Sequence, residues 1–176
     1  MVQGASYRPD DPELQRLRSR ARALVARHAT APEEERDAIL RTLLGCVGDG
    51  VEVLPGFRCD YGSQISIQDG TFVNFDCVML DAAPIALGAH CQLGPRVQLL
   101  TSTHPLDAAE RRSGWESARP ISLGDDVWLG GGVIVCPGVS IGEATVVGAG
   151  AVVTRDLPAG VVAVGVPARV QRRVAS

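Results

Sequence analysis

The sequence predicts a mainly β protein, a parallel β-helix of hexapeptide repeats, with a helical hairpin in front of it and a long loop excursion at about 101–120. Aliphatic residues recur every six positions along most of the chain, whereas the segment 1–50 carries a helical pattern. Glycine and proline number 20 and 11, which favours many tight turns over long elements. The aliphatic repeat is interrupted once, between Leu99 and Gly130.

The period of six is clearest in the second half of the chain, at Leu123, Leu129, Val135, Ile141, Val147 and Val153. Neither an α-helix nor a β-hairpin has this period, but the stacked short strands of a parallel β-helix do. The segment 87–99 keeps the same phase, and 67–79 keeps the period in another phase, which indicates a shift by two positions near 81–84. If three hexads make one coil, Cys59 and Cys77 stack on adjacent strands, because they lie three hexads apart.

The segment 1–50 predicts a helical cap, and residues 51–176 the β-helix, as one structural unit. Asp11 is suited to cap the first helix and Pro12 to occupy its first position. The apolar positions that follow share one helical face. A second helix is expected from Pro32 to just before Gly45.

Composition excludes several classes of function. A net charge of −3 gives no reason to expect nucleic acid, and no segment resembles a signal peptide or a membrane span. The five cysteines include no CxxC pair, which favours reduced thiols and a cytoplasmic protein. The three histidines, His28, His90 and His104, lack the spacing of the zinc site found in β-helical hydratases, so no metal is expected.

Several motifs resemble the maltose and galactoside O-acetyltransferase family, and most closely its maltose type. They are "PGFRCDYG" (55–62), "NFDCVMLD" (74–81), "STHPLD" (102–107), "PISLGDDVWLGGGVIVCPGVSIG" (120–142), "VVGAGAVVTRDLP" (146–158) and "VGVPARV" (164–170). The resemblance implies a left-handed β-helix and a homotrimer with active sites between subunits. It also implies acetyl-CoA as co-substrate and direct transfer of acetyl to a sugar hydroxyl, without an acyl-enzyme.

The chemistry needs a general base, because a sugar hydroxyl is a poor nucleophile near neutral pH. His104 stands where the loop leaves the repeat, and the resemblance implies that it is this base. Asn74 matches the family's acceptor-binding asparagine, which is also proposed to stabilise the transition state. The backbone N–H of Gly131 matches the donor to the oxyanion, although three glycines in a row also relieve crowding at a turn.

For the acceptor, the resemblance points to Asp60, Asn74 and Asp81. Ala82 stands where the galactoside type has a second sugar-binding acid, which argues against a galactoside. Whether Asp10 or Asp11 reaches a neighbouring subunit's site is left open. Acetyl-CoA is expected at Gly131, Ala149, Thr154, Arg155, Arg169, Arg172 and Trp128. Without the resemblance, the arginines at 169 and 172 read as a solvated basic tail.

Two alternatives stay open. In the first, the chain is a hexapeptide-repeat acetyltransferase that acts on another small acceptor, such as an amine, an antibiotic, or a cell-wall or lipo-oligosaccharide precursor. In the second, it is a trimeric scaffold whose activity has decayed. The presence of His104, Asn74 and Arg169 together favours an active enzyme that acetylates a maltose- or glucose-like sugar.

Overall fold

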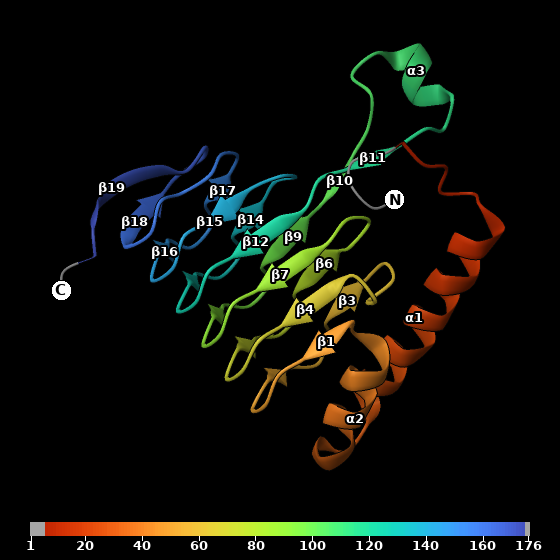
Figure 1. Ribbon diagram of the computed structural model, residues 1–176, viewed down its shortest axis with the longest axis horizontal. Coiled ribbons are helices and arrows are strands. Elements are labelled where there is room, and N and C mark those ends of the chain that lie inside the picture. Colours follow the sequence, from red (N-terminus) through yellow and green to blue (C-terminus); the bar gives the residue numbers. More distant parts are fainter. Residues whose placement is uncertain (1–5, 175–176) are drawn as a thin grey trace.

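The structure, a computed structural model, describes residues 6–174. Two helices, α1 (Pro12–Thr30) and α2 (Glu33–Leu43), precede a prism of short parallel strands (Figure 1). The first sheet contains β1 (Cys46–Val47), β4 (Ile65–Ile67), β7 (Ile85–Leu87), β12 (Ile121–Leu123) and β15 (Ser140–Ile141). The predicted parallel β-helix is confirmed.

The other two sheets complete the prism. The second sheet contains β2 (Glu52–Val53), β5 (Phe72–Val73), β8 (Gln92–Leu93), β13 (Trp128–Leu129), β16 (Val146–Val147), β18 (Val161–Val164) and the antiparallel β19 (Arg169–Arg173). The third contains β3 (Arg58–Cys59), β6 (Val78–Leu80), β9 (Gln98–Leu100), β14 (Ile134–Val135) and β17 (Val152–Val153). Successive coils therefore stack strand upon strand in all three sheets.

Coil length varies along the prism. Leu123 pairs with Ile141, and this spacing equals three hexads. Ile65 pairs with Ile85, a spacing that is two positions longer. The early coils are thus the longer ones, as the phase shift near 81–84 indicates. The expected stacking of Cys59 on Cys77 is wrong for this reason, because the longer coil pairs Cys59 with Met79.

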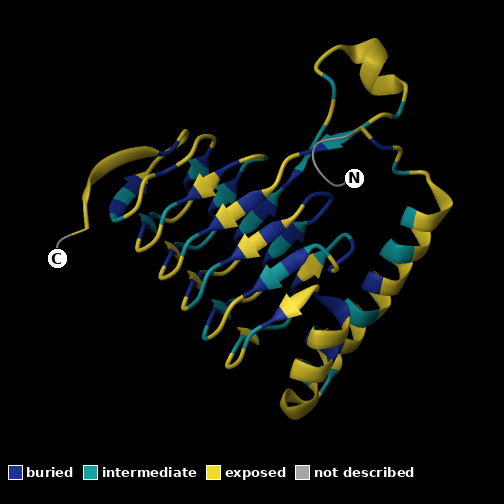
Figure 2. Cartoon of the chain, in the orientation of Figure 1, coloured by how far each residue is buried: buried dark blue, intermediate teal, exposed yellow. Residues whose placement is uncertain are grey.

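The core is aliphatic, as the repeat predicts, and runs through the interior of the prism (Figure 2). Leu129, Val135 and Val147 are fully buried. Cys77 and Cys91 are also buried, and burial raises the pKa of the Cys77 thiol to about 11. These thiols therefore stay protonated and pack as small hydrophobic groups. All five cysteines are free.

The helical cap closes the N-terminal end of the prism. Asp11 caps α1 by accepting a hydrogen bond of 2.8 Å from the N–H of Glu13. Ala21 and His28 of α1 are buried against the prism. The β-helix begins at Cys46 of β1, which already pairs with β4, so the cap ends slightly before position 50.

The excursion at 101–120 is confirmed as a loop that projects from the prism (Figure 1). Its neck is an antiparallel pair, β10 (Ser102–Thr103) with β11 (Ser117–Ala118), and its tip is the short helix α3 (Ala108–Arg112). Ile85 pairs with Ile121 across the excursion. The spacing of this pair is a whole number of hexads, so the aliphatic repeat resumes in phase.

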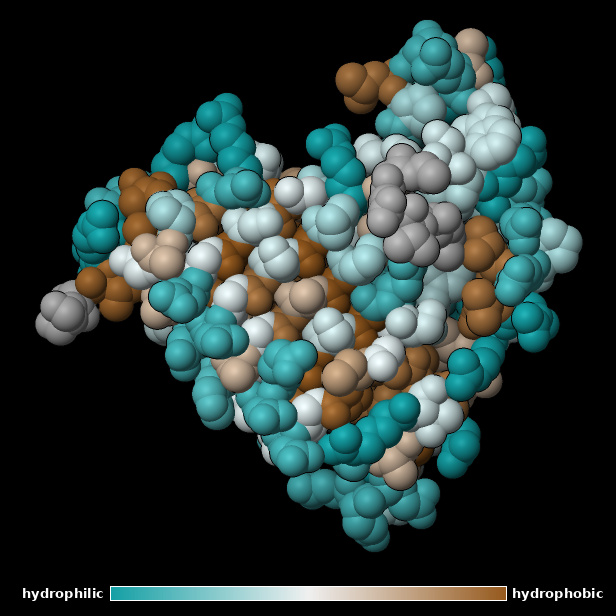
Figure 3. All heavy atoms as spheres, viewed as in Figure 1, coloured by the Kyte–Doolittle hydropathy of each residue, from teal (hydrophilic) through white to brown (hydrophobic). Residues whose placement is uncertain are grey.

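Hydrophobic and hydrophilic residues occupy different parts of the surface. Hydrophobic residues lie in stripes over the prism, and hydrophilic residues cover the turns and the helices (Figure 3). Among the described residues, no helix is long and apolar enough to cross a membrane.

Candidate active site

The functional residues predicted from sequence gather mainly on two of the three edges of the prism. The asparagine edge is the set of turns between the second and third sheets, at 54–57, 74–77, 94–97, 130–133 and 148–151. The histidine edge is the set of turns between the third and first sheets, at 60–64, 81–84, 101–120, 136–139 and 154–156. The strands of the third sheet separate the two edges.

The histidine edge carries Asp60, Asp81, His104, Thr154 and Arg155. The asparagine edge carries Asn74, Gly131 and Ala149. One chain therefore keeps the predicted base, His104, and the predicted acceptor-binding Asn74 on different edges.

His104 lies at the neck of the loop excursion, directly after β10. Its side chain is 55% exposed, and its Nδ1 atom lies 3.9 Å from Oε1 of Glu116, which is 20% exposed. This separation suits an ion pair when the imidazole is protonated but exceeds a hydrogen bond. The phenol of Tyr7 donates a hydrogen bond of 2.8 Å to the other carboxylate oxygen, Oε2. An exposed imidazole backed by a restrained carboxylate can accept a proton from a bound ligand.

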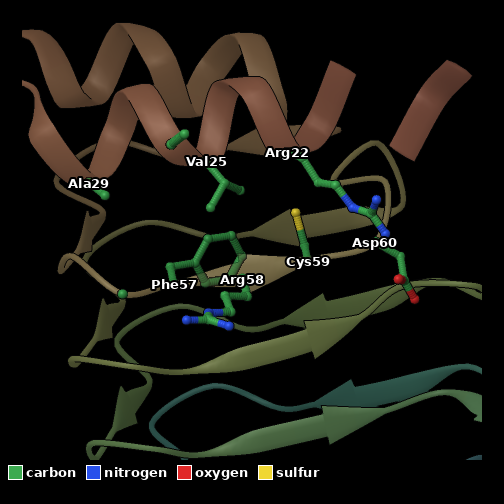
Figure 4. Close-up of a pocket in the computed structure, with 9 residues that line it drawn as sticks. Arg22, Val25, Ala29, Phe57, Arg58, Cys59 and Asp60 are labelled. Atoms are coloured by element: carbon green, nitrogen blue, oxygen red, sulfur yellow. The ribbon is translucent and has the colours of Figure 1, made fainter. Parts of the chain in front are cut away.

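Asp60 lies near Glu116, the carboxylate beside His104. It lines a cavity of about 450 Å³ between α1 and the first coil (Figure 4). Val25 and Ala29 of α1 face Phe57 and Cys59 across it. Burial, and then the neighbouring Asp81, raise the pKa of the Asp60 carboxyl, and Glu116 adds to the rise. Asp60 therefore presents a poorly solvated carboxyl group that can hydrogen-bond a hydroxyl in either protonation state.

Asp81 is fully buried, and its carboxylate accepts hydrogen bonds from the N–H groups of Asp60 (3.1 Å), Tyr61 (2.8 Å) and Gln64 (3.3 Å). The expectation that Asp81 contacts the acceptor directly is contradicted by this burial. A carboxylate that is inaccessible and bonded to backbone cannot meet a ligand. Asp81 instead holds the turn that presents Asp60.

Asn74 is half-buried on the asparagine edge, and its Oδ1 accepts a hydrogen bond of 2.7 Å from the N–H of Phe75. This local bond fixes the side chain while its amide N–H groups still provide donors. Beside it, a cavity of about 550 Å³ is lined by Phe75, Asp76, Pro95, Arg96, Gly131 and Gly132. Phe75 is 51% exposed, so this cavity has an apolar rim.

The glycines at 130 and 131 differ in their surroundings. A Cβ on Gly130 would lie 2.6 Å from the backbone nitrogen of Ala149, so close stacking of coils requires glycine there. A Cβ on Gly131 would meet Pro95 at 3.4 Å and beyond, which is ordinary contact. Packing therefore explains Gly130 and leaves Gly131 without a structural requirement.

The chain is similar to known acetyltransferases in sequence and in structure. Residues 1–48 match the maltose acetyltransferase hexapeptide capping motif, and residues 120–155 match the bacterial transferase hexapeptide (six repeats). A maltose O-acetyltransferase structure from Clostridium difficile 630 is 42% identical, with a TM-score of 0.96 over 98% of this chain and 94% of that one. The galactoside O-acetyltransferase of Escherichia coli (strain K12) is 35% identical over 160 residues, 90% of this chain and 79% of the relative.

A third similar protein was solved with a ligand. It is a hexapeptide-repeat acetyltransferase from Vibrio cholerae O1 biovar eltor in complex with acetyl coenzyme A, 39% identical, with a TM-score of 0.95 over 100% of this chain and 97% of that one. The chain belongs to the maltose and galactoside O-acetyltransferase family. As a member of this family it is an acyltransferase with a left-handed β-helix, and acetyl-CoA is its co-substrate.

Three of the residues that the sequence predicts to bind acetyl-CoA are exposed near the asparagine edge. Trp128 of β13 is 56% exposed and offers a flat apolar surface. Arg169 and Arg172 are exposed on β19, which pairs with β18 beside this edge. Their guanidinium groups are suited to the phosphates of CoA. Thr154 and Arg155, also exposed, lie on the histidine edge.

The sequence left open a role for Asp10 or Asp11 in a neighbouring site, and it predicted no metal site. Asp10 is exposed and forms an ion pair of 3.0 Å with Arg8, and Asp11 caps α1. Within residues 6–174, no group of three His, Cys, Asp or Glu side chains is placed to hold a metal ion. His90 lies on a turn of the prism, and His28 is buried on α1, far along the chain from the loop.

Sequence reasoning missed Tyr7 and Glu116. Glu116 lies inside the interrupted repeat, in the same loop as His104, so its position was a usable signal. Tyr7 is separated from Glu116 by 109 positions in sequence, and no local pattern connects the two.

Proposed function

We propose that this acetyltransferase moves acetyl from acetyl-CoA to a hydroxyl of a maltose- or glucose-like sugar, with His104 as general base. The observation that carries the proposal is the exposed imidazole of His104 at the neck of the loop, backed by the restrained carboxylate of Glu116. The relatives named as maltose and galactoside O-acetyltransferases support a sugar acceptor. Ala82, where the galactoside type carries an acid, favours the maltose type.

In the proposed reaction, the acceptor oxygen attacks the thioester carbonyl carbon while His104 takes the hydroxyl proton. The tetrahedral oxyanion is held by the N–H of Gly131, and Asn74 binds the acceptor. The intermediate collapses as the C–S bond breaks, and the proton on His104 passes to the departing CoA sulfur. Products are the acetyl ester and CoA, and His104 returns to its neutral form.

We further propose that the active site forms between subunits of a homotrimer. His104 and Asp60 on the histidine edge of one protomer would face Asn74, Gly131 and Ala149 on the asparagine edge of the next. This contact would bring together two edges that the third sheet separates within one chain. A closed three-fold ring repeats this head-to-tail contact three times. A cytoplasmic location, where acetyl-CoA is supplied, agrees with five free thiols.

Thiol release from acetyl-CoA tests the proposal, with maltose, glucose, a thiogalactoside and a small amine as acceptors. We expect the two glucose-type sugars to stimulate release most. His104→Ala should lower kcat about 100-fold or more, with binding of acetyl-CoA unchanged. His90→Ala is the matched control, because His90 lies on a turn of the same prism but away from the loop, and it should retain full activity. Stimulation by the amine alone would refute the sugar acceptor, and full activity of His104→Ala would refute the base.

A further inference from the structure

Glu116 is the carboxylate beside His104, and three hydrogen bonds hold it to Tyr7. Its backbone N–H donates to the carbonyl of Tyr7 at 3.0 Å, and its carbonyl accepts from the N–H of Tyr7 at 2.9 Å. Its Oε2 accepts the Tyr7 hydroxyl at 2.8 Å. Oε1 is the oxygen nearest to His104, at 3.9 Å from Nδ1. The two carboxylate oxygens therefore have separate neighbours.

The side chain of Tyr7 is buried. It is 7% exposed and packs in a small apolar cluster with Tyr61, Ala82, Ala83 and Ala118, apart from the main core. Burial, and then the hydrogen bond to Glu116, raise the pKa of the Tyr7 phenol, so it stays protonated and can donate near neutral pH. A phenol that donates to a carboxylate forms a charge-assisted bond, which is short and well directed.

We propose that Tyr7, acting through Glu116, is a positioning residue for His104. The inference deepens the proposed function, since it assumes that His104 is the base. A neutral imidazole carries one N–H group. If Nδ1 holds the proton and directs it at Glu116, Nε2 keeps its lone pair for the acceptor hydroxyl. The opposite tautomer would present a proton to the acceptor and block the reaction.

The separation of 3.9 Å agrees with this role. A direct hydrogen bond needs about 1 Å less, and such contacts are commonly long in unliganded enzymes and shorten when substrates bind. A Glu116 side chain without Tyr7 would be free to rotate away from the imidazole. The bond from Tyr7 therefore keeps Oε1 on the His104 side.

The arrangement also connects the helical cap to the loop excursion. Tyr7 belongs to the segment that leads into α1, and Glu116 belongs to the loop, next to β11. The cap segment thus contributes to the geometry of the base in addition to closing the prism.

Three substitutions and one matched control test the proposal. Tyr7→Phe removes only the hydroxyl that binds Glu116. Glu116→Ala removes the carboxylate, and Glu116→Gln keeps an acceptor oxygen. Tyr61→Phe is the control, because Tyr61 packs in the same cluster but its hydroxyl accepts from Arg18 at 3.0 Å instead of binding Glu116.

The first readout is the tautomer of His104, measured from 15N shifts of the imidazole nitrogens. With three histidines in the chain, His28→Gln and His90→Gln complete the assignment. We expect the Nδ1–H tautomer in the unaltered protein and in Tyr61→Phe. In Tyr7→Phe and Glu116→Ala the Nε2–H tautomer should increase, with a smaller change in Glu116→Gln.

The second readout is steady-state kinetics. We expect kcat to fall about 10-fold in Glu116→Ala and several-fold in Tyr7→Phe, with the KM for acetyl-CoA unchanged, and Glu116→Gln to restore part of the rate. A purely structural role would lower the melting temperature without a tautomer change. Unaltered tautomer populations and kcat in Tyr7→Phe and Glu116→Ala would overturn the proposal. Full activity of His104→Ala would instead refute the proposed function, independently of the tautomer data.

Discussion

Asn74 and His104 lie on different edges of the same prism, separated by the strands of the third sheet. Asn74 follows β5, at the turn into the third sheet, and His104 follows β10 in the loop that leaves the third sheet. Each residue has a suitable neighbourhood, with a cavity and Gly131 near Asn74 and the restrained Glu116 near His104. We therefore expect a site that uses both residues to combine one edge from each of two protomers.

This relationship predicts that two inactive variants restore each other. We expect Asn74→Ala and His104→Ala homotrimers to be inactive, and equal amounts refolded together to recover about a quarter of the unaltered activity. Three quarters of random trimers are mixed, and each mixed trimer holds one intact site out of three when the ring is head-to-tail. Thiol release measures the recovery, with each variant refolded alone as the control. No recovery in verified mixed trimers would mean that both residues come from one chain.

The glycines at 130 and 131 are expected to separate stability from co-substrate binding. Gly130→Ala would bring a methyl group to 2.6 Å from backbone, so its melting temperature should fall clearly. Gly131→Ala meets only ordinary contacts and should melt as the unaltered protein does, while the KM for acetyl-CoA rises about 10-fold or more. Calorimetry and thiol release check the pair. An unchanged KM in Gly131→Ala would mean that acetyl-CoA does not approach the face of Gly131 on which the methyl group lies, and would leave the proposed role of its backbone N–H untouched.

Arg169 and Arg172 are expected to bind CoA phosphates. Replacing either by alanine should raise the KM for acetyl-CoA about 10-fold, because a charge-assisted bond to phosphate is lost, and should leave kcat unchanged. Acetyl-dephospho-CoA, which lacks the 3′-phosphate, tests the pairing. The arginine that binds that phosphate should lose its effect with this analogue. Exposed Arg16 on α1 provides the control, and an equal effect of Arg16→Ala would indicate general electrostatics.

His28 is expected to make the protein sensitive to acid. Burial, and then Arg36, lower the pKa of His28, and among the described residues its Nε2 atom has no hydrogen-bond partner. The unfolded chain therefore takes up a proton first as pH falls through about 6.5, so the free energy of unfolding decreases below that pH. Melting temperatures between pH 7.5 and 5.5 should fall less steeply in His28→Gln than in the unaltered protein. Equal slopes would show that other groups cause the loss.

The sequence by itself determined the fold and the family of acyltransferases to which the chain belongs. The period of six predicts the prism because one inward aliphatic per strand is needed for burial, whatever surrounds it. The loop at 101–120 was visible because it breaks that repeat. The role of Asp11 follows from local hydrogen bonding, and the resemblance supplied His104 and Asn74.

Only the tertiary structure decided how these residues are grouped. Coil length set the register, so that Cys59 pairs with Met79 rather than with Cys77. Asp81 proved to be buried beneath the turn of Asp60, and Tyr7 reached Glu116 from the far end of the sequence. Such contacts join segments that are distant along the chain, and a small change in the length of a turn alters them. Local patterns therefore determine which elements form, whereas the packing of those elements decides which side chains meet.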